Sequence, residues 1–273
     1  MRTHLSVTSV KEPVADFVMR IAIFSDIHGN TIALDAVLAD IQTQGGVDEY
    51  WLLGDHVAIG HDPIGVLERL SKLPNAHFVR GNTDRYVISD QIYQEWIERA
   101  KKDLNQLPRT IEEIRSINWT RGAITSAGWF DWLAALPLDR RCALPDGTRV
   151  LCVHASVGTD EGRGMNPQMT DDELWGLFKE CEADLVFVGH THQAQDRTVN
   201  GVRLINPSSV SNPIAPDLRA GYVLLVADEK GYHLEQRRVD YDHEAVVEAI
   251  HKIKHPAAEL VTQHIRGQQL PRL

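Results

Sequence analysis

The sequence contains few cysteines, which excludes a disulfide framework. Only Cys142, Cys152 and Cys181 occur among 273 residues, and no two of them form a C-x-x-C pair. Domains that depend on disulfides or on cysteine-bound zinc carry more cysteines at closer spacings. We therefore predict a protein of a reducing compartment, and we expect it in the cytoplasm.

Long apolar runs are also absent. No stretch approaches the roughly 20 apolar residues that a membrane-spanning helix needs, so we expect no membrane partner. The first 18 residues, MRTHLSVTSVKEPVADFV, have no apolar region typical of a signal peptide. We expect residues 1–18 to be an N-terminal tail or early-start extension, and the fold to begin at Met19.

The chain has fewer positively than negatively charged residues. The chain has 28 Lys and Arg against 38 Asp and Glu, a formal net charge of −10, and it has no Lys/Arg-rich run. Such a surface repels duplex nucleic acid, which we exclude as a partner. An acidic protein that handles a phosphate must neutralise it locally, and metal ions do this well. The composition leaves open whether the chain forms a homo-oligomer.

Short apolar runs alternate with helical patterns along the chain. Because the earlier runs lack period-two alternation, they predict strands covered on both faces. Asn30 can cap a helix, Thr170 and Glu173 form a capping box, and residues 221–242 read as a strand hairpin. This alternation predicts an α/β fold in a single domain, residues 19–255, followed by a C-terminal tail, residues 256–273. The expected strands are residues 20–24, 49–54, 76–81, 149–155, 184–190, 202–207, 221–228 and 232–242.

A helix-rich insertion of about residues 85–136 interrupts this alternation. It carries an unusual share of the aromatic residues: Tyr86, Tyr93, Trp96, Trp119, Trp129 and Trp132. One interpretation is a helical subdomain with a small core of its own. Another is a cap that shapes access of a substrate. The two interpretations are compatible.

Polar signatures follow the expected strands. They read Asp26-x-His28, Gly54-Asp55, Gly81-Asn82-Thr83-Asp84, His154, and Gly189-His190-Thr191-His192. Ligands of an open α/β sheet bind beyond the carboxyl ends of its strands, so parallel neighbours would bring these signatures to one crevice. The residues expected to face that crevice are Asp26, His28, Asp55, Asn82, His154, His190 and His192.

Two carboxylates and four imidazoles packed together without partners would be costly. Cations resolve the conflict, because neutral imidazole nitrogens and carboxylate oxygens suit Mn, Fe, Ni or Zn. Seven ligands are too many for one tetrahedral ion but fit two ions that share a carboxylate. A lone D-x-H or H-x-H is weak and is more often a surface or cap feature. The ordered set predicts two transition-metal ions.

The ordered motifs resemble the calcineurin-like metallophosphoesterase superfamily, over about residues 19–250. The segments SDIHGN, VHAS, GHTH and INPSSV look most like its compact YfcE-like phosphodiesterase branch. The resemblance implies a four-layer α/β/β/α sandwich with a helical cap insertion, and it favours manganese. It assigns one metal to Asp26, His28 and His192, the other to Asn82, His154 and His190, and the bridge to Asp55.

The resemblance also implies a mechanism, in which a metal-bridging hydroxide generated at Asp55 attacks phosphorus. Asp84 is expected behind the ligands, orienting an imidazole. Many relatives carry histidine where this chain has Thr83, and without that acid poor leaving groups should suffer most. His56 and His61 could substitute for it, or they are exposed loop histidines. Ser208 replaces a usual glycine, which we expect to change only the turn.

Arginines are candidates for phosphate contact, because guanidinium grips phosphate with two hydrogen bonds. The candidates are Arg80, Arg85, Arg163 and Arg219, with Arg85 and Arg163 preferred, and His61 is a further candidate for substrate binding. A surface arginine paired with an acidic residue is the commoner outcome.

We expect a phosphodiesterase acting on a small phosphate ester or a nucleotide. A phosphatase of monoesters, dinucleoside polyphosphates or phosphoproteins is the alternative. A catalytically weak interaction scaffold, like the retromer subunit of this superfamily, is a further one.

Overall fold

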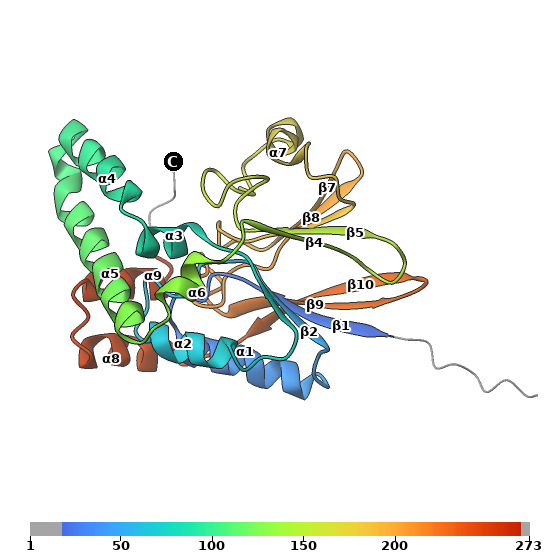
Figure 1. The fold of residues 1–273 in the computed structure, drawn as a ribbon, viewed down its shortest axis with the longest axis horizontal. Coiled ribbons are helices and arrows are strands. Elements are labelled where there is room, and N and C mark those ends of the chain that lie inside the picture. The colour runs from blue at the N-terminus through green and yellow to red at the C-terminus, as the bar shows by residue number, and fades with distance from the viewer. Residues whose placement is uncertain (1–17, 269–273) are drawn as a thin grey trace, which may run out of the picture.

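The computed structural model describes residues 18–268 and consists of two stacked sheets with helices outside them (Figure 1). The first sheet has the strand order β10-β9-β1-β2-β3, and the second has the order β4-β5-β6-β8-β7. Residues 1–17 of the expected N-terminal tail lie outside the described part of the chain. The strands are β1 (Met19–Phe24), β2 (Glu49–Leu52), β3 (Ala76–Phe78), β4 (Asp139–Ala143), β5 (Arg149–Val153), β6 (Leu185–Val188), β7 (Gln195–Val199), β8 (Val202–Asn206), β9 (Ala220–Asp228) and β10 (Gly231–Val239).

Helices connect the strands and cover the outer faces. Several start with a capping residue that the sequence carries. Asn30 accepts a hydrogen bond from the N–H of Ala33 at 3.0 Å, and the capping box of Thr170 and Glu173 is formed. The helices are α1 (Thr31–Thr43), α2 (Pro63–Leu70), α3 (Asn82–Ile88), α4 (Gln91–Lys102), the 3₁₀ turn η1 (Leu104–Gln106), α5 (Leu107–Ser126), α6 (Phe130–Ala134), α7 (Asp171–Phe178), α8 (His243–Lys252) and α9 (Ala258–Ile265).

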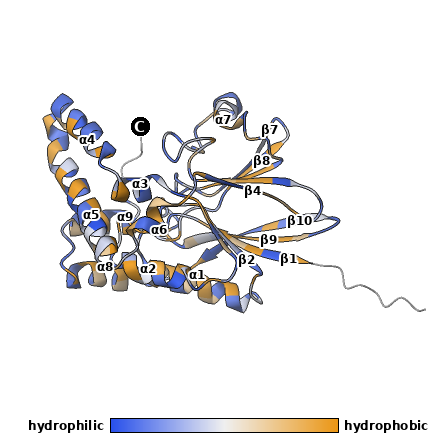
Figure 2. Cartoon of the chain, viewed as in Figure 1, coloured by the Kyte–Doolittle hydropathy of each residue, from blue (hydrophilic) through white to orange (hydrophobic). Residues whose placement is uncertain are grey.

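The core between the two sheets explains the continuous apolar runs. Ile21, Ile23 and Trp51 of the first sheet pack against Phe187 and Ile205 of the second. The other face of the first sheet is buried under α1 and α2, and that of the second under α7. Figure 2 shows hydrophobic residues in the strands of both sheets and along the helices. The four-layer α/β/β/α fold predicted from the sequence is confirmed.

The insertion forms helices α3 to α6 and has a hydrophobic cluster of its own. Ile92 and Trp96 of α4 pack with Ile117 and Ile124 of α5 in this cluster, which also includes Val57 from the loop after β2. Trp119 instead contacts His255, with ring centroids 4.7 Å apart. The insertion therefore packs against both the first sheet's loops and the C-terminal helices.

Three elements were not expected from the sequence. Strands β4 and β7 are the two edges of the second sheet and read DRRCA and QDRTV. Edge strands often carry charged residues that discourage pairing with other chains, so they lack an apolar signal. The expected tail from residue 256 is also wrong in part. Helix α9 buries Val261 and Ile265 completely against α8, while residues 269–273 lie outside the described range.

No helix within residues 18–268 is both long enough and apolar enough to span a membrane.

Candidate metal centre

The polar signatures lie at the carboxyl ends of parallel strands in both sheets. Strands β1, β2 and β3 run parallel, as do β5 and β6. Backbone hydrogen bonds join the first two loops, because Asp26 N–H donates to Gly54 C=O at 3.0 Å and His28 N–H to Asp55 C=O at 2.9 Å. The β5 and β6 loops join them across the sandwich, where Gly189 N–H donates to His154 C=O at 2.9 Å and His190 N–H to Asp26 Oδ2 at 3.1 Å.

Several of these residues adopt a left-handed backbone conformation. The φ angles of Asp26, His28, Asp55, His190 and His192 lie between 49° and 70°. Non-glycine residues rarely adopt this conformation, at a cost of about 1–3 kcal/mol each, and they cluster at functional sites. The surrounding hydrogen bonds hold each turn so that its side chain points to the shared crevice.

The first group of side chains comprises Asp26, His28, Asp55 and His192. All four are buried, and one potential ligand atom from each lies within 4.8 Å of the others. The Nε2 atoms of His28 and His192 are 3.3 Å apart, and His192 Nε2 is 3.1 Å from Asp26 Oδ1.

The second group comprises Asn82, His154 and His190. His190 Nδ1 lies 3.2 Å from His154 Nε2. The side-chain oxygen of Asn82 is 3.1 Å from His154 Nε2 and 2.9 Å from His190 Nδ1.

Asp55 faces both groups with one carboxylate. Its Oδ2 lies 3.7 Å from His28 Nε2, and its Oδ1 lies 3.5 Å from His154 Nε2. The Asp55 side chain has no exposed surface. Its position between two clusters of nitrogen and oxygen atoms is the position a bridging ligand needs.

The outward nitrogen of every imidazole is bonded to a backbone carbonyl. His28 Nδ1, His192 Nδ1 and His154 Nδ1 donate to the carbonyls of Ala58, Asn212 and Leu53, at 2.9, 2.7 and 2.7 Å. His190 is reversed, with Nε2 donating to the Gly162 carbonyl at 2.9 Å. Such bonds fix the tautomer of a metal-ligating histidine and leave the inward nitrogen with its lone pair.

The inward atoms of these side chains are arranged as metal ligands would be. Two pairs of inward imidazole nitrogens oppose each other at 3.2–3.3 Å beside buried carboxylates. Lone pairs at this distance repel one another unless a proton or a cation lies among them. Imidazole, carboxylate and amide donors suit Mn, Fe, Ni or Zn, so the donor set fits.

Ionisation in the metal-free chain follows from the same crowding. Burial lowers the pKa of His28 to about 4. Burial opposes protonation of His154 as well, but Asp55 and Asp26 outweigh it and raise the pKa of His154 to about 9. Burial disfavours ionised Asp26, yet neighbouring His192 lowers the pKa of that carboxyl below its usual value. A metal at His154 must therefore displace a proton.

Comparison with known proteins identifies the family of the chain. A family model described as the calcineurin-like phosphoesterase superfamily domain matches residues 19–230. The chain belongs to that superfamily. Metal dependence and phosphoester hydrolysis are therefore expected of this phosphoesterase, and the sequence-based family prediction is confirmed at that level.

The chain is similar to several individual proteins. An uncharacterised protein of Methanocaldococcus jannaschii, MJ0912, is 31% identical over 252 residues, which cover 86% of this chain and 93% of the relative. A symmetrical bis(5'-nucleosyl)-tetraphosphatase of Pectobacterium atrosepticum is 34% identical over 98 residues, covering 35% of this chain and 34% of that enzyme. The crystal structure of the hypothetical protein PH1004 from Pyrococcus horikoshii OT3 has a TM-score of 0.74 at 19% identity, with coverage of 90% and 97%, and shows the same fold.

Thr83 and Asp84 of the phosphoesterase hold the loops next to the predicted ligands. Thr83 donates its N–H to Asp55 Oδ1 at 2.9 Å, which orients the carboxylate. Asp84 accepts backbone N–H bonds from His56 and Gly81, at 2.9 and 3.0 Å. The nearest approach of Asp84 to the His56 ring is 3.9 Å, so Asp84 holds the backbone of two loops and does not hydrogen-bond that imidazole.

His56 and His61 are buried and not exposed loop histidines. The His56 ring is bonded to the Val79 carbonyl at 3.1 Å and lies against Phe78 and Trp132. His61 Nε2 lies 3.2 Å from the hydroxyl of Thr31. These contacts give His56 a packing role, and they do not support it as a general acid.

The candidate arginines are all paired with acidic residues. Arg80 and Arg85 contact Asp160, Arg163 contacts Glu173 at 3.2 Å, and Arg219 contacts Asp217. Arg163 is 58% exposed and its ion pair is therefore weak, which leaves it the most available for a substrate.

Sequence reasoning missed the loop of residues 206–212, although the motif INPSSV pointed to it. Ser209 Oγ donates to Asp26 C=O at 2.9 Å, and Ser208 Oγ donates to His192 C=O at 3.0 Å. Ser208 has φ 79°, the glycine-like conformation. The prediction that Ser208 changes only the turn was therefore incomplete, because its hydroxyl also holds the His192 loop.

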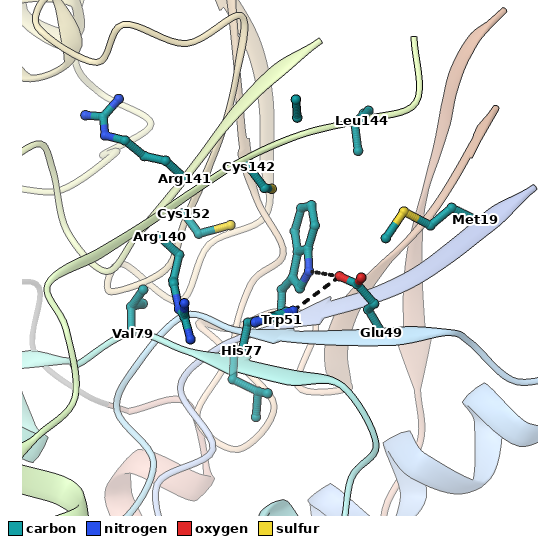
Figure 3. Close-up of a pocket in the computed structure, with 12 residues that line it drawn as sticks. Met19, Glu49, Trp51, His77, Val79, Arg140, Arg141, Cys142, Leu144 and Cys152 are labelled. Atoms are coloured by element: carbon teal, nitrogen blue, oxygen red, sulfur yellow. Dashed lines mark hydrogen bonds and ion pairs between the residues drawn. The ribbon is translucent and has the colours of Figure 1, made fainter. Parts of the chain in front are cut away.

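A cavity of about 190 Å³ lies elsewhere, between the edge strands β3 and β4 (Figure 3). Trp51, Cys142, Cys152 and Leu144 line it, and the Trp51 indole N–H donates to Glu49 at 2.9 Å. None of the seven predicted ligands lines this cavity, so we do not assign it to the metal centre.

Proposed function

We propose that the chain is a dinuclear-metal-dependent phosphoesterase that hydrolyses phosphodiester bonds. The observation that carries the proposal is the position of Asp55, whose two oxygens face the His28 group and the His154 group at 3.7 and 3.5 Å. Asp26, His28 and His192 would hold one ion, and Asn82, His154 and His190 the other. Manganese is the preferred ion of the proposal.

Bound ions at these two groups would supply positive charge for the phosphoryl oxygens and would ionise water near neutral pH. The residues of the chain then have positioning tasks. The four backbone carbonyls hold the imidazoles in one tautomer. The N–H of Thr83 and the packing around Asp55 orient the shared carboxylate. Phosphoryl transfer asks little more of side chains than such positioning.

The preference for diesters rests on position 83. A threonine hydroxyl cannot protonate a leaving alkoxide near neutral pH, whereas a histidine can. His56 is bonded to the Val79 carbonyl and packed against aromatic rings, so it does not replace that histidine. Activated diesters, whose leaving groups need no proton, should therefore be favoured over alkyl monoesters.

The test compares a diester with its matching monoester on the same manganese-loaded protein. We expect bis(p-nitrophenyl) phosphate to be hydrolysed faster than p-nitrophenyl phosphate, measured as kcat/KM. Turnover of the monoester alone would reject the preference for diesters but keep a phosphoesterase.

A dinucleoside polyphosphate is the second candidate substrate. The similarity to the symmetrical tetraphosphatase supports it, although the match spans about a third of either protein. A third arm of the same assay with diadenosine tetraphosphate separates the candidates. Cleavage of this substrate at a higher kcat/KM than the diester would select it.

A scaffold without catalysis is the third alternative. The seven predicted ligands lie close together, and the outward nitrogens of the four imidazoles are bonded to backbone carbonyls, which a scaffold does not need. Metal analysis separates the two: fewer than one ion per chain after anaerobic purification with Mn or Fe would favour the scaffold.

A further inference from the structure

The loop between β5 and α7 crosses to helix α3 through one buried carboxylate. We name residues 159–164 of this loop the strap. Asp160 is only 3% exposed and accepts hydrogen bonds from Arg80 Nε and Arg85 Nε, both at 2.9 Å. The two arginines flank Asn82 in the chain, one before it and one after it.

The next residue of the strap strengthens the same connection. Glu161 accepts a hydrogen bond from Arg85 Nη2 at 2.5 Å and another from the Tyr86 hydroxyl. The strap is therefore attached to α3 by two consecutive carboxylates. Asn82 is the first residue of α3, so the strap is attached close to it.

The strap then reaches His190. The carbonyl of Gly162 accepts the Nε2–H of His190 at 2.9 Å. Gly164 lies against the same ring, because a Cβ atom at that position would be 2.9 Å from His190 Cδ2. The strap thus holds one ring nitrogen of His190 and packs against its edge, which leaves Nδ1 facing Asn82 and His154.

We infer that Asp160 is a positioning residue that holds the Asn82, His154 and His190 group in the geometry of a metal site. It acts through Arg80 and Arg85 on the Asn82 turn, and through the Gly162 carbonyl on His190. The inference rests on the proposed dinuclear function. It adds that one of the two ion sites depends on the strap more than the other does.

The buried ion pairs of Asp160 favour a positioning role for this residue over a general packing role. Exposed ion pairs such as Arg163–Glu173 contribute little to any geometry. Removing the charge of Asp160 leaves the largely buried guanidinium of Arg80 without its carboxylate and that of Arg85 with Glu161 alone, which is costly and forces rearrangement. The rearrangement would begin at the segments next to Asn82 and His190.

The His28 group is connected to the strap only indirectly, through the Thr83 N–H on Asp55 and the His190 N–H on Asp26. Its outward nitrogens are bonded to the carbonyls of Ala58 and Asn212, which belong to other loops. A change at Asp160 should therefore weaken the His154 group more than this group. This difference between the groups makes the inference measurable.

The experiment measures manganese stoichiometry and affinity in the full chain by calorimetric titration of the metal-free protein, with the electron paramagnetic resonance signal as a second readout. Asp160→Asn should weaken one site by about 10- to 100-fold, as loss of an outer partner typically does. The spin-coupled signal of a manganese pair should then give way to the signal of a single ion at limiting metal. Asp196→Asn is the matched control, because it breaks another aspartate–arginine pair, with Arg203, away from the strap.

Gly162→Ala is a second variant in case Asp160→Asn does not fold. Gly162 has φ 115°, which an alanine resists, but no atom lies within 4 Å of the added Cβ. It should displace the carbonyl from His190 and weaken the same single site, with the Asp160 pairs intact.

The outcomes separate the positioning role of Asp160 from the proposed dinuclear function. Loss of one site in the strap variants and two sites in Asp196→Asn support the inference. Two sites of unchanged affinity in Asp160→Asn, with or without a lower melting temperature, would overturn it and leave the proposed function standing. Fewer than two sites in the unmodified chain would overturn the dinuclear proposal, and this inference with it.

Discussion

The Nε2 atoms of His28 and His192 lie 3.3 Å apart, although 163 residues separate the two histidines in the chain. Each ring donates its other N–H to a backbone carbonyl, so both inward nitrogens carry lone pairs unless a proton or metal ion occupies them. The arrangement stores repulsion that a cation relieves. Metal binding should therefore stabilise the fold as well as complete the site.

The shared carboxylate gives the first prediction. Asp55→Asn removes the negative charge that faces both imidazole pairs, and it replaces one oxygen with an amide that repels a cation. We expect manganese affinity to fall at both sites and kcat/KM for the diester to fall by at least about 100-fold. Metal titration and steady-state kinetics check this. Retention of two tight sites would show that Asp55 is not the bridge.

Gly54 gives a prediction about space rather than charge. A Cβ atom there would lie 2.6 Å from Gly81 N and 2.7 Å from His154 Nδ1, at a φ of 97°. We expect Gly54→Ala to lower the free energy of unfolding by about 3 kcal/mol or more and to weaken metal binding.

Gly128→Ala is the control for Gly54. Gly128 has a similar φ of 79°, but nothing lies within 4 Å of the added atom. The free energy of unfolding should therefore fall by about 1 kcal/mol, from the backbone conformation alone. Equal losses for the two variants, measured by denaturant unfolding, would mean that the contact with the His154 loop is unimportant.

Ser209 gives a prediction about the loop that joins the two halves of the site. Its buried hydroxyl donates to the Asp26 carbonyl at 2.9 Å and accepts the N–H of Asn212 at 2.8 Å. Ser209→Ala removes both hydrogen bonds and leaves the Asp26 carbonyl with the Ser211 N–H at 3.2 Å, at a cost of about 1–3 kcal/mol. It should also weaken the ion site at Asp26 and His192, since Asn212 holds His192.

The control for Ser209 is Ser71→Ala, which removes an exposed hydroxyl bonded to the Glu68 carbonyl. Urea unfolding of the metal-free proteins should show a change within about 0.5 kcal/mol for this variant. If both serine variants behave alike, the 206–212 loop does not organise the site.

The burial of His255, away from the metal centre, should make the free energy of unfolding depend on pH. It is 4% exposed and lies edge-on to Trp119, and burial lowers its pKa from 6.5 to about 4. Between pH 6.5 and 4 the unfolded chain binds a proton that the folded chain excludes, so the free energy of unfolding falls as the pH falls through this window. The contribution is about 1–3 kcal/mol at pH 4.

The difference between the parent and His255→Phe isolates this contribution. The phenylalanine keeps the contact with Trp119 but cannot be protonated. Unfolding of the metal-free proteins at pH 7 and pH 4.5 should show a smaller loss for the variant. The same loss in both proteins would place the acid sensitivity elsewhere.

Buried strands that end in a polar residue allowed the fold and the candidate site to be predicted from the sequence. Asp26, Asp55 and His154 each follow an apolar run, and burial of the run fixes where its end must lie. The edge strands β4 and β7 carry no such run, and helix α9 is short, so these elements were missed. The contacts of Asp160 could not be predicted, because they join segments about 80 residues apart and leave no periodic pattern.

The burial of His56 shows a different limit. A histidine after Gly-Asp in a polar loop resembles an exposed residue, and only packing of the insertion against Phe78 and Trp132 encloses it. The outward hydrogen bonds to Ala58, Leu53, Gly162 and Asn212 are likewise invisible in sequence, because any residue supplies a carbonyl. The candidate ligands could be proposed from the sequence, whereas the orientation of their side chains required the fold.

Anomalous scattering from crystals grown with manganese tests the central claim most directly. A difference map collected at the manganese edge should contain two peaks per chain, one between His28 and His192 and one between His154 and His190, with Asp55 contacting both. A single peak, or peaks away from these side chains, would contradict the account.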